Sequence, residues 1–205
     1  MATIKIYGVP LSTFTRTACL AAHEKGVDYE LVPMRPSELG ALNPFKKIPV
    51  LQHGDLTLYE TTAILRCLDR TFAGPRLWPD DSRGAALCDQ WSSAVCDSLV
   101  NSALRYIAST LGFLPVPAEM QAKYLDKARE VVPAFEARLG ASRYLAGPSV
   151  TAADLFAFPL IALFPAFPQL SEILATSPNC QRWTAEMAAR PSARATEPEM
   201  PRQAA

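Results

Sequence analysis

Short alternating runs of apolar residues open the chain, and longer runs with helical spacing separate them. Residues 4–7 alternate and are followed by Gly8, which predicts a strand. Residues 12–25 begin with hydroxyl side chains and stop at Gly26, which predicts a helix. A second strand is expected at residues 29–32. The beginning of the chain therefore predicts a strand–helix–strand unit.

A hairpin and another helix are expected next. Two short apolar runs, residues 49–51 and 56–59, flank a turn that contains Gly54, which is typical of a β-hairpin. Residues 61–72 then carry apolar side chains three or four positions apart, the spacing of an amphipathic helix. Together with the first unit, this order predicts a small mixed sheet flanked by helices.

Strand patterns end after a linker at residues 73–81, which contains glycine and prolines. The rest of the chain predicts an all-helical domain, and residues 151–164 are so uniformly apolar that their helix should be buried on all sides. Its expected helices cover residues 83–111, 117–139, 151–164, 169–175 and 179–189. We therefore predict two domains, at residues 1–75 and 84–205.

The composition is ordinary for a globular protein of 205 residues, with 49% apolar and 20% charged residues. Lys and Arg together number 20, as do Asp and Glu, so the formal net charge is zero. Nucleic-acid binding needs a surplus of cations, so no nucleic-acid partner is expected. The five cysteines lack CxxC spacing and there are two histidines, so neither a disulfide framework nor a metal site is predicted.

The sequence also bears on location. No basic stretch followed by a long apolar one stands at the N-terminus, so no secretory signal is expected. The longest apolar run, residues 155–167, is too short for a bilayer and contains Pro159 and Pro165. We therefore expect no membrane partner and a reduced, cytoplasmic location.

The dipeptide Ile48-Pro49 stands directly before a predicted strand. Proline lacks an amide donor, so Pro49 belongs at a strand start or in a tight turn. If the bond is cis, it would turn a backbone amide outward, where an extended peptide can bind. An ordinary trans proline at a strand end is the alternative.

A second signal is Glu60-Thr61-Thr62, where a strand gives way to a helix. Amides and hydroxyls at a helix N-terminus attract an anionic group, and Glu60 beside them can pair with an ammonium group. A ligand with both charges on one carbon is an α-amino acid, so this corner suits the γ-glutamyl end of glutathione. Simple helix capping by Thr61 or Thr62 is the alternative.

Thr151 and Asp154 form a third pattern, a capping box at the start of the buried helix. It concerns folding, and no catalytic role is expected for it.

These residues together resemble glutathione transferases, and the resemblance covers almost the whole chain. The matching segments, in the family's order, are Asn43-Pro44-Phe45, Ile48-Pro49, residues 60–64, residues 144–147, residues 151–154, Pro178-Asn179 with Trp183, and Ala189-Arg190-Pro191. The resemblance implies a thioredoxin-like N-terminal domain, an all-helical C-terminal domain and a homodimer.

The resemblance also indicates where the thiol of glutathione is activated. A free thiol has a pKa near ~8.5, and a hydrogen-bond donor or a helix N-terminus favours the thiolate. Residues 7–16 resemble the serine-type, phi-like members, in which a serine follows the strand-end glycine by four residues and a Thr-Arg pair comes soon after. Ser12 fills that place.

Two rivals stay open. Thr13 is adjacent, and Tyr7 stands where tyrosine-type members carry their catalytic phenol. Ser12 as a mere helix cap is the other alternative. Cys19 is too far inside the helix for cysteine-type chemistry.

The resemblance implies roles for the rest of the glutathione site. Ile48, next to Pro49, would offer its backbone to the cysteinyl part, and Lys47 would lie near the glycyl carboxylate. Glu60 and Thr61 would hold the γ-glutamyl end. The family more often has Gln at the place of Lys47 and Ser at that of Thr61.

Phe45 is a candidate for the dimer contact that the resemblance implies, because an exposed phenylalanine is costly unless a partner covers it. Packing within its own subunit is the alternative.

The predicted function is an enzyme that conjugates glutathione, a co-substrate and not a cofactor, to small hydrophobic electrophiles. Leu11, Thr13 and the helix at residues 83–111, with Tyr106 and Phe113, are expected to line the electrophile pocket. The alternatives are glutathione-dependent peroxide reduction or isomerisation at the same site, and a non-catalytic ligand-binding protein.

Overall fold

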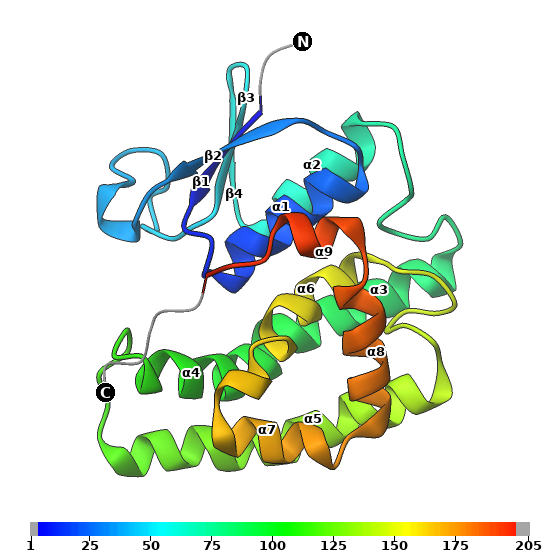
Figure 1. The fold of residues 1–205 in the computed structure, drawn as a ribbon. Coiled ribbons are helices and arrows are strands. Elements are labelled where there is room, and N and C mark those ends of the chain that lie inside the picture. The colour runs from blue at the N-terminus through cyan, green and yellow to red at the C-terminus, as the bar shows by residue number, and fades with distance from the viewer. Residues whose placement is uncertain (1–3, 200–205) are drawn as a thin grey trace. The chain divides into compact units, whose positions relative to one another are not determined.

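The structure is a computed structural model and describes residues 4–199. It divides into two compact units, drawn as ribbons in Figure 1. The first contains the chain up to Leu77 together with the segment from Ala189, and the second runs from Trp78 to Ala188.

The first unit is built on a four-stranded mixed sheet. Its elements are β1 (Ile4–Gly8), α1 (Thr13–Glu24), β2 (Tyr29–Pro33), the 3-10 turn η1 (Pro36–Glu38), β3 (Val50–His53), β4 (Leu56–Tyr59), α2 (Thr61–Thr71) and α9 (Pro191–Ala195). The strand order is β2-β1-β3-β4, with β1 and β2 parallel and the other pairs antiparallel. The predicted mixed sheet and its flanking helices are confirmed.

Helix α1 lies against β1 and packs beside α2. The core between these helices and the sheet consists of fully buried apolar side chains, among them Ile4, Ile6, Leu20, Leu51, Ile64 and Leu65. Gly8 allows this close approach, because a Cβ atom there would lie 2.3 Å from Oγ1 of Thr15. The end of β1 therefore has no room for a side chain on the side of α1.

A buried ion pair holds the segment that follows α2, up to Leu77, against the rest of the first unit. Nζ of Lys25 lies 3.2 Å from Oδ1 of Asp69 and donates to the carbonyl of Pro75 at 3.0 Å. The same Oδ1 accepts from the amide of Leu77 at 2.8 Å. The pair is thus hydrogen-bonded on both sides, which a buried ion pair needs in order not to destabilise the fold.

The second unit is helical, as predicted. Its elements are α3 (Ser82–Ala94), the π-helix η2 (Val95–Leu104), α4 (Arg105–Thr110), α5 (Ala118–Ala141), α6 (Ala152–Ile161), the 3-10 turn η3 (Phe164–Ala166), α7 (Pro168–Ala175) and α8 (Pro178–Ala188). The helix predicted at residues 83–111 is therefore split by ten residues of π-helix.

Helix α6 is the buried centre of the second unit, and all ten of its residues are buried. The predicted capping box of Thr151 and Asp154 is confirmed at its start. Asp154 also accepts hydrogen bonds from the amide of Leu145 and from the indole of Trp183, both at 2.9 Å. One carboxylate thus joins the loop before α6, the helix itself and α8.

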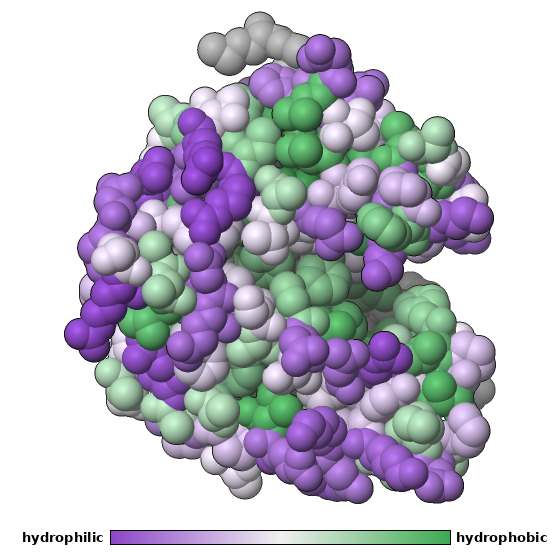
Figure 2. All heavy atoms as spheres, turned by 180° about the vertical axis from the view of Figure 1, so that it is seen from behind, coloured by the Kyte–Doolittle hydropathy of each residue, from purple (hydrophilic) through white to green (hydrophobic). Residues whose placement is uncertain are grey.

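Among residues 4–199, no single helix is long and apolar enough to cross a membrane. The segments Ala152–Ala166 and Pro168–Ala175 pass that test of length and composition only as a pair, bent by 112°. On the face seen in Figure 2, hydrophilic residues surround smaller apolar areas. Phe45, at 62% exposure, and Phe113, at 68%, are among the large apolar side chains that reach the surface.

Candidate functional site

The strand register brings the predicted glutathione-binding segments to one end of the sheet. Tyr7 pairs with Val50, and Val50 pairs with Tyr59. The loop that follows β1, the dipeptide that precedes β3 and the first residues of α2 therefore meet at this end, where both α1 and α2 begin (Figure 1). Neighbouring strands lie about 4.8 Å apart, so β1 and β4 are roughly 10 Å apart. An extended tripeptide has about this length.

Ser12 is the N-cap of α1, and its Oγ accepts a hydrogen bond from the amide of Thr15 at 3.3 Å. Its own amide closes the preceding turn on the carbonyl of Val9 at 3.0 Å. A hydroxyl has two acceptor lone pairs and one proton to donate. Capping the helix uses one lone pair, so the capping role is confirmed and leaves the proton able to bind a ligand.

The two rival hydroxyls have different surroundings. The hydroxyl of Tyr7 donates to Oε1 of Gln52 on β3 at 2.8 Å, so its proton is already engaged within the sheet. Thr13 is the first residue of α1 and is 7% exposed. Ser12 is half-buried and therefore more accessible than Thr13.

Cys19 lies inside α1 and is buried. Burial raises the pKa of its thiol to about 11, although a hydrogen bond with Tyr29 acts in the opposite direction. A thiol with this pKa stays protonated at neutral pH and is a poor nucleophile. The geometry agrees with the prediction that cysteine-type chemistry has no place at this helix.

A buried asparagine holds the loop that carries Lys47 and Ile48. Asn43 donates from Nδ2 to the carbonyl of Lys47 at 2.7 Å and accepts at Oδ1 from the amide of Phe45 at 2.9 Å. The peptide bond between Ile48 and Pro49 is cis. The side chain of Lys47 is exposed, and Pro49 is buried. In the sequence, Asn43 belongs to the segment Asn43-Pro44-Phe45 that resembles the family. Its role in holding the backbone before Ile48 is seen only in the structure.

Glu60 occupies the N-cap position of α2 with an unusual backbone, φ +65°. The N-cap is Glu60 and not a threonine, and no side-chain cap hydrogen bond is formed among the described residues, so the predicted alternative of capping by Thr61 or Thr62 is wrong. The first amides of α2 are thus left to bind an anion, beside the exposed carboxylate of Glu60. A left-handed backbone at a residue other than glycine costs on the order of 1–3 kcal/mol and is found mostly at functional sites.

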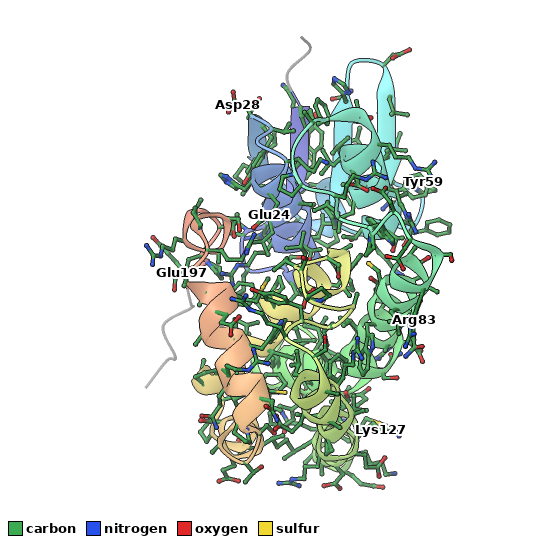
Figure 3. The ribbon with its side chains drawn as sticks, turned by 90° about the vertical axis from the view of Figure 1, so that its right-hand side faces the viewer. Glu24, Asp28, Tyr59, Arg83, Lys127 and Glu197 are labelled. Carbon is green, nitrogen blue, oxygen red and sulfur yellow. The ribbon has the colours of Figure 1, made fainter. Side chains whose placement is uncertain are left out.

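Phe45 and Tyr59 form an edge-to-face pair with ring centroids 5.8 Å apart. Tyr59 ends β4, one of the two edge strands of the sheet, and is labelled in Figure 3. In the second unit, Tyr106 is buried and its hydroxyl donates to Gln169 at 2.8 Å, whereas Phe113 is exposed.

The first unit has a four-stranded mixed sheet with two helices that start at one end of it, and the second unit is helical. This arrangement defines a thioredoxin-like domain joined to an all-helical one. Family models confirm this fold class: "Glutathione S-transferase, N-terminal domain" matches residues 6–76 and "Glutathione S-transferase, C-terminal domain" matches residues 90–191. The chain belongs to the glutathione S-transferase family.

Individual relatives agree with this assignment. Glutathione S-transferase 4 of Zea mays is 35% identical over 97% of this chain and 93% of its own length. The solved structure of glutathione S-transferase III in apo form matches with a TM-score of 0.86 and 27% identity, covering 98% of this chain and 99% of its own. Glutathione S-transferase I from mais, solved in complex with an atrazine glutathione conjugate, matches with a TM-score of 0.82 and 29% identity. The match covers 95% of this chain and 96% of that structure's chain.

These relatives are plant enzymes of the phi class, so the predicted phi-like resemblance is confirmed, as is the prediction that the chain is a glutathione transferase.

Proposed function

We propose that Ser12 activates the thiol of bound glutathione for attack on a small hydrophobic electrophile. The observation that carries this proposal is the geometry of Ser12: its Oγ accepts from the amide of Thr15 and keeps a proton to donate at the N-terminus of α1. A hydroxyl donor and the positive end of a helix both stabilise a thiolate.

The rest of the tripeptide would lie along the end of the sheet. The amides at the start of α2, with Thr61, bind the γ-glutamyl carboxylate, and Glu60 pairs with the ammonium group. Ile48 pairs its backbone with the cysteinyl residue beside Pro49, and the exposed ammonium of Lys47 meets the glycyl carboxylate. Glutathione would thereby be held at three points while its sulfur faces Ser12.

The reaction needs no cofactor. The thiol loses its proton to solvent, the thiolate attacks an electrophilic carbon, and a carbon–sulfur bond forms while the leaving group departs with its electron pair. The protein contributes a lowered thiol pKa and the proximity of the two reactants. Glutathione S-transferase I from mais was solved in complex with an atrazine glutathione conjugate, which supports conjugation as the reaction of this chain.

Titration of the thiolate absorbance of bound glutathione tests the role of Ser12. A hydrogen bond to a charged group contributes about 1.5–3 kcal/mol, which corresponds to roughly 1–2 pH units. We expect Ser12→Ala to raise the thiol pKa by this amount and to lower kcat in parallel. Tyr7→Phe and Thr13→Ala serve as controls with little effect. An unchanged thiol pKa in Ser12→Ala, with a raised one in either control, would assign the activation to another hydroxyl.

We also propose that the protein is a cytoplasmic homodimer in which Phe45 contacts the partner subunit. Phe45 is 62% exposed although its ring forms an edge-to-face pair with Tyr59. No disulfide bond joins the cysteines within residues 4–199, as is usual in a reducing compartment. Light scattering after size-exclusion chromatography should find Phe45→Ser shifted to the monomer at micromolar concentration. Phe113→Ser, which alters an equally exposed phenylalanine, should leave the mass unchanged; equal behaviour of the two variants contradicts the proposal.

A further inference from the structure

The outer side of α1 is covered by the end of the chain. Residues 13–22 of α1 are buried almost throughout, although a helix on the surface of a sheet normally keeps one polar face in water. The sheet and α2 cover two sides, and α9 packs on the third. We call residues 190–197, which include α9, the C-terminal strap. In Figure 3, Glu24 on α1 and Glu197 on the strap lie on these neighbouring segments.

One end of the strap is fastened to the last turn of α1. Arg190 binds Glu24 through two hydrogen bonds, Nε to Oε1 at 2.8 Å and Nη2 to Oε2 at 2.6 Å. The hydroxyl of Ser192 donates to Oε1 of the same carboxylate. The side chain of Glu24 is only 9% exposed, so these bonds form largely out of water, where a bidentate pair is strong and fixes geometry.

This anchor seats the next residue of the strap on the N-terminal half of α1. Ala193 follows Ser192 directly, and its carbonyl accepts from Nη2 of the buried Arg16 at 3.2 Å. The backbone amide of Arg16 in turn donates to the carbonyl of Ser12 at 2.9 Å. Hydrogen bonds at Glu24, Ala193 and Ser12, joined by the backbone of the strap and by Arg16, thus connect the last turn of α1 with the residue proposed to bind the sulfur.

The strap also reaches the loop before Ser12. A cavity of about 160 Å³ is lined by Ala195 and Thr196 of the strap on one side and by Pro10 and Thr15 on the other. The strap therefore leaves a space beside the loop before Ser12, and the hydrogen bonds at Glu24 and Arg16 are among the polar contacts that hold it against α1.

We propose that the C-terminal strap is a positioning element of the glutathione site, in which Arg190, Ser192 and Glu24 hold the carbonyl of Ala193 against Arg16 and so fix Ser12. This inference rests on the proposed role of Ser12. In this proposal Arg190 and Ser192 are positioning residues, which act through Arg16. A displacement of about 1 Å at a reacting group can lower a rate on the order of 100-fold, so a modest shift of the first turn of α1 is measurable.

The test compares Arg190→Gln with Arg182→Gln. Arg182 is a matched control in the second unit, because it also binds a carboxylate, Glu186 at 3.0 Å, and a backbone carbonyl, that of Leu139 at 3.0 Å. In the full-length protein we expect Arg190→Gln to raise the pKa of the bound glutathione thiol and to lower kcat about tenfold. The kcat of Arg182→Gln should stay within twofold of the wild-type value. Arg190→Lys should have a kcat between those of Arg190→Gln and the wild type.

A merely structural strap would lower the melting temperature of Arg190→Gln and leave the thiol pKa of the folded protein unchanged, and that result overturns the proposal. If Arg190→Gln does not fold, Ser192→Ala, which removes one hydrogen bond, is judged by the same criterion. Ser12→Ala is measured in parallel. If the thiol pKa rises in Ser12→Ala but not in the strap variants, only the positioning role of the strap is refuted. If the thiol pKa is unchanged in Ser12→Ala, the proposed activation by Ser12 is itself refuted.

Discussion

The contact between Gly8 and Thr15 makes a sharp prediction about how α1 is placed. An alanine at position 8 would bring its Cβ within 2.3 Å of Oγ1 and 2.7 Å of Cγ2 of Thr15. Ordinary contacts begin near 3.4 Å, so the overlap is about 1 Å. Thr15 is fully buried and β-branched, and its side chain has little freedom to rotate away. Helix α1 must therefore move away from β1.

The expected cost of Gly8→Ala follows from this overlap. Overpacking of a dense core destabilises by about 1–3 kcal/mol. For a chain of this size, 1 kcal/mol lowers the melting temperature by roughly 2–4 °C, so a loss of roughly 2–12 °C is expected. Since Ser12 caps the same helix, the activity of the folded variant should fall by more than its stability accounts for.

A double-mutant cycle isolates the contact. Oγ1 of Thr15 is buried without a hydrogen-bond partner among the described residues, so Thr15→Ala removes the colliding atoms and breaks no hydrogen bond of that hydroxyl. Thr15→Ala alone should be mild, and Gly8→Ala/Thr15→Ala should recover most of the stability and rate lost in Gly8→Ala. Thermal melts and conjugation rates of the four proteins measure both. If Gly8→Ala melts like the wild type, or if the two changes simply add, the steric argument is refuted.

Two further predictions concern buried carboxylates. Asp154→Ala leaves three donors without their acceptor: the amides of Leu145 and Thr151 and the indole of Trp183. At about 1–3 kcal/mol for each unsatisfied donor, the free energy of unfolding in urea should fall by about 3–9 kcal/mol. Asp126→Ala, which breaks an exposed ion pair, should change the free energy of unfolding little. Burial by itself would raise the pKa of Glu24, but the hydrogen bonds from Arg190 and Ser192 hold it below the usual value. Its stabilisation is therefore present above the unfolded pKa of about 4.3 and is lost as the pH falls through the lower folded pKa. Acid titration should show a steeper loss of stability in the wild type than in Glu24→Gln, and equal slopes would contradict the assigned shift.

Much of the sheet, and the places where its helices begin, could be predicted because local patterns specify them. The alternation at residues 4–7, the hairpin around Gly54 and the capping box at Thr151 each depend on neighbours in sequence. The π-helix Val95–Leu104 was not predicted, because the local pattern there does not distinguish a π-helix from an α-helix. Its buried apolar residues recur about every fourth position, and this spacing fits i→i+4 and i→i+5 hydrogen bonds equally well.

Long-range polar contacts were beyond sequence reasoning. The pairing of Arg190 with Glu24 joins residues 166 positions apart, and nothing in either local segment indicates it. The left-handed backbone of Glu60 is a second case, because local preference favours Thr61 or Thr62 as a cap and only the surrounding fold overrides it. In both cases tertiary structure decides the geometry.

Ser12 carries two requirements on one oxygen atom. The helix uses a lone pair that faces the amide of Thr15, and the proposed activation of the thiol needs the proton of the same hydroxyl. An aspartate would meet the first requirement as well as a serine does, yet it would present a negative charge where a thiolate has to form. Folding and catalysis can therefore be lost separately at this position, and a fully stable, soluble variant of this protein is no evidence of an active one.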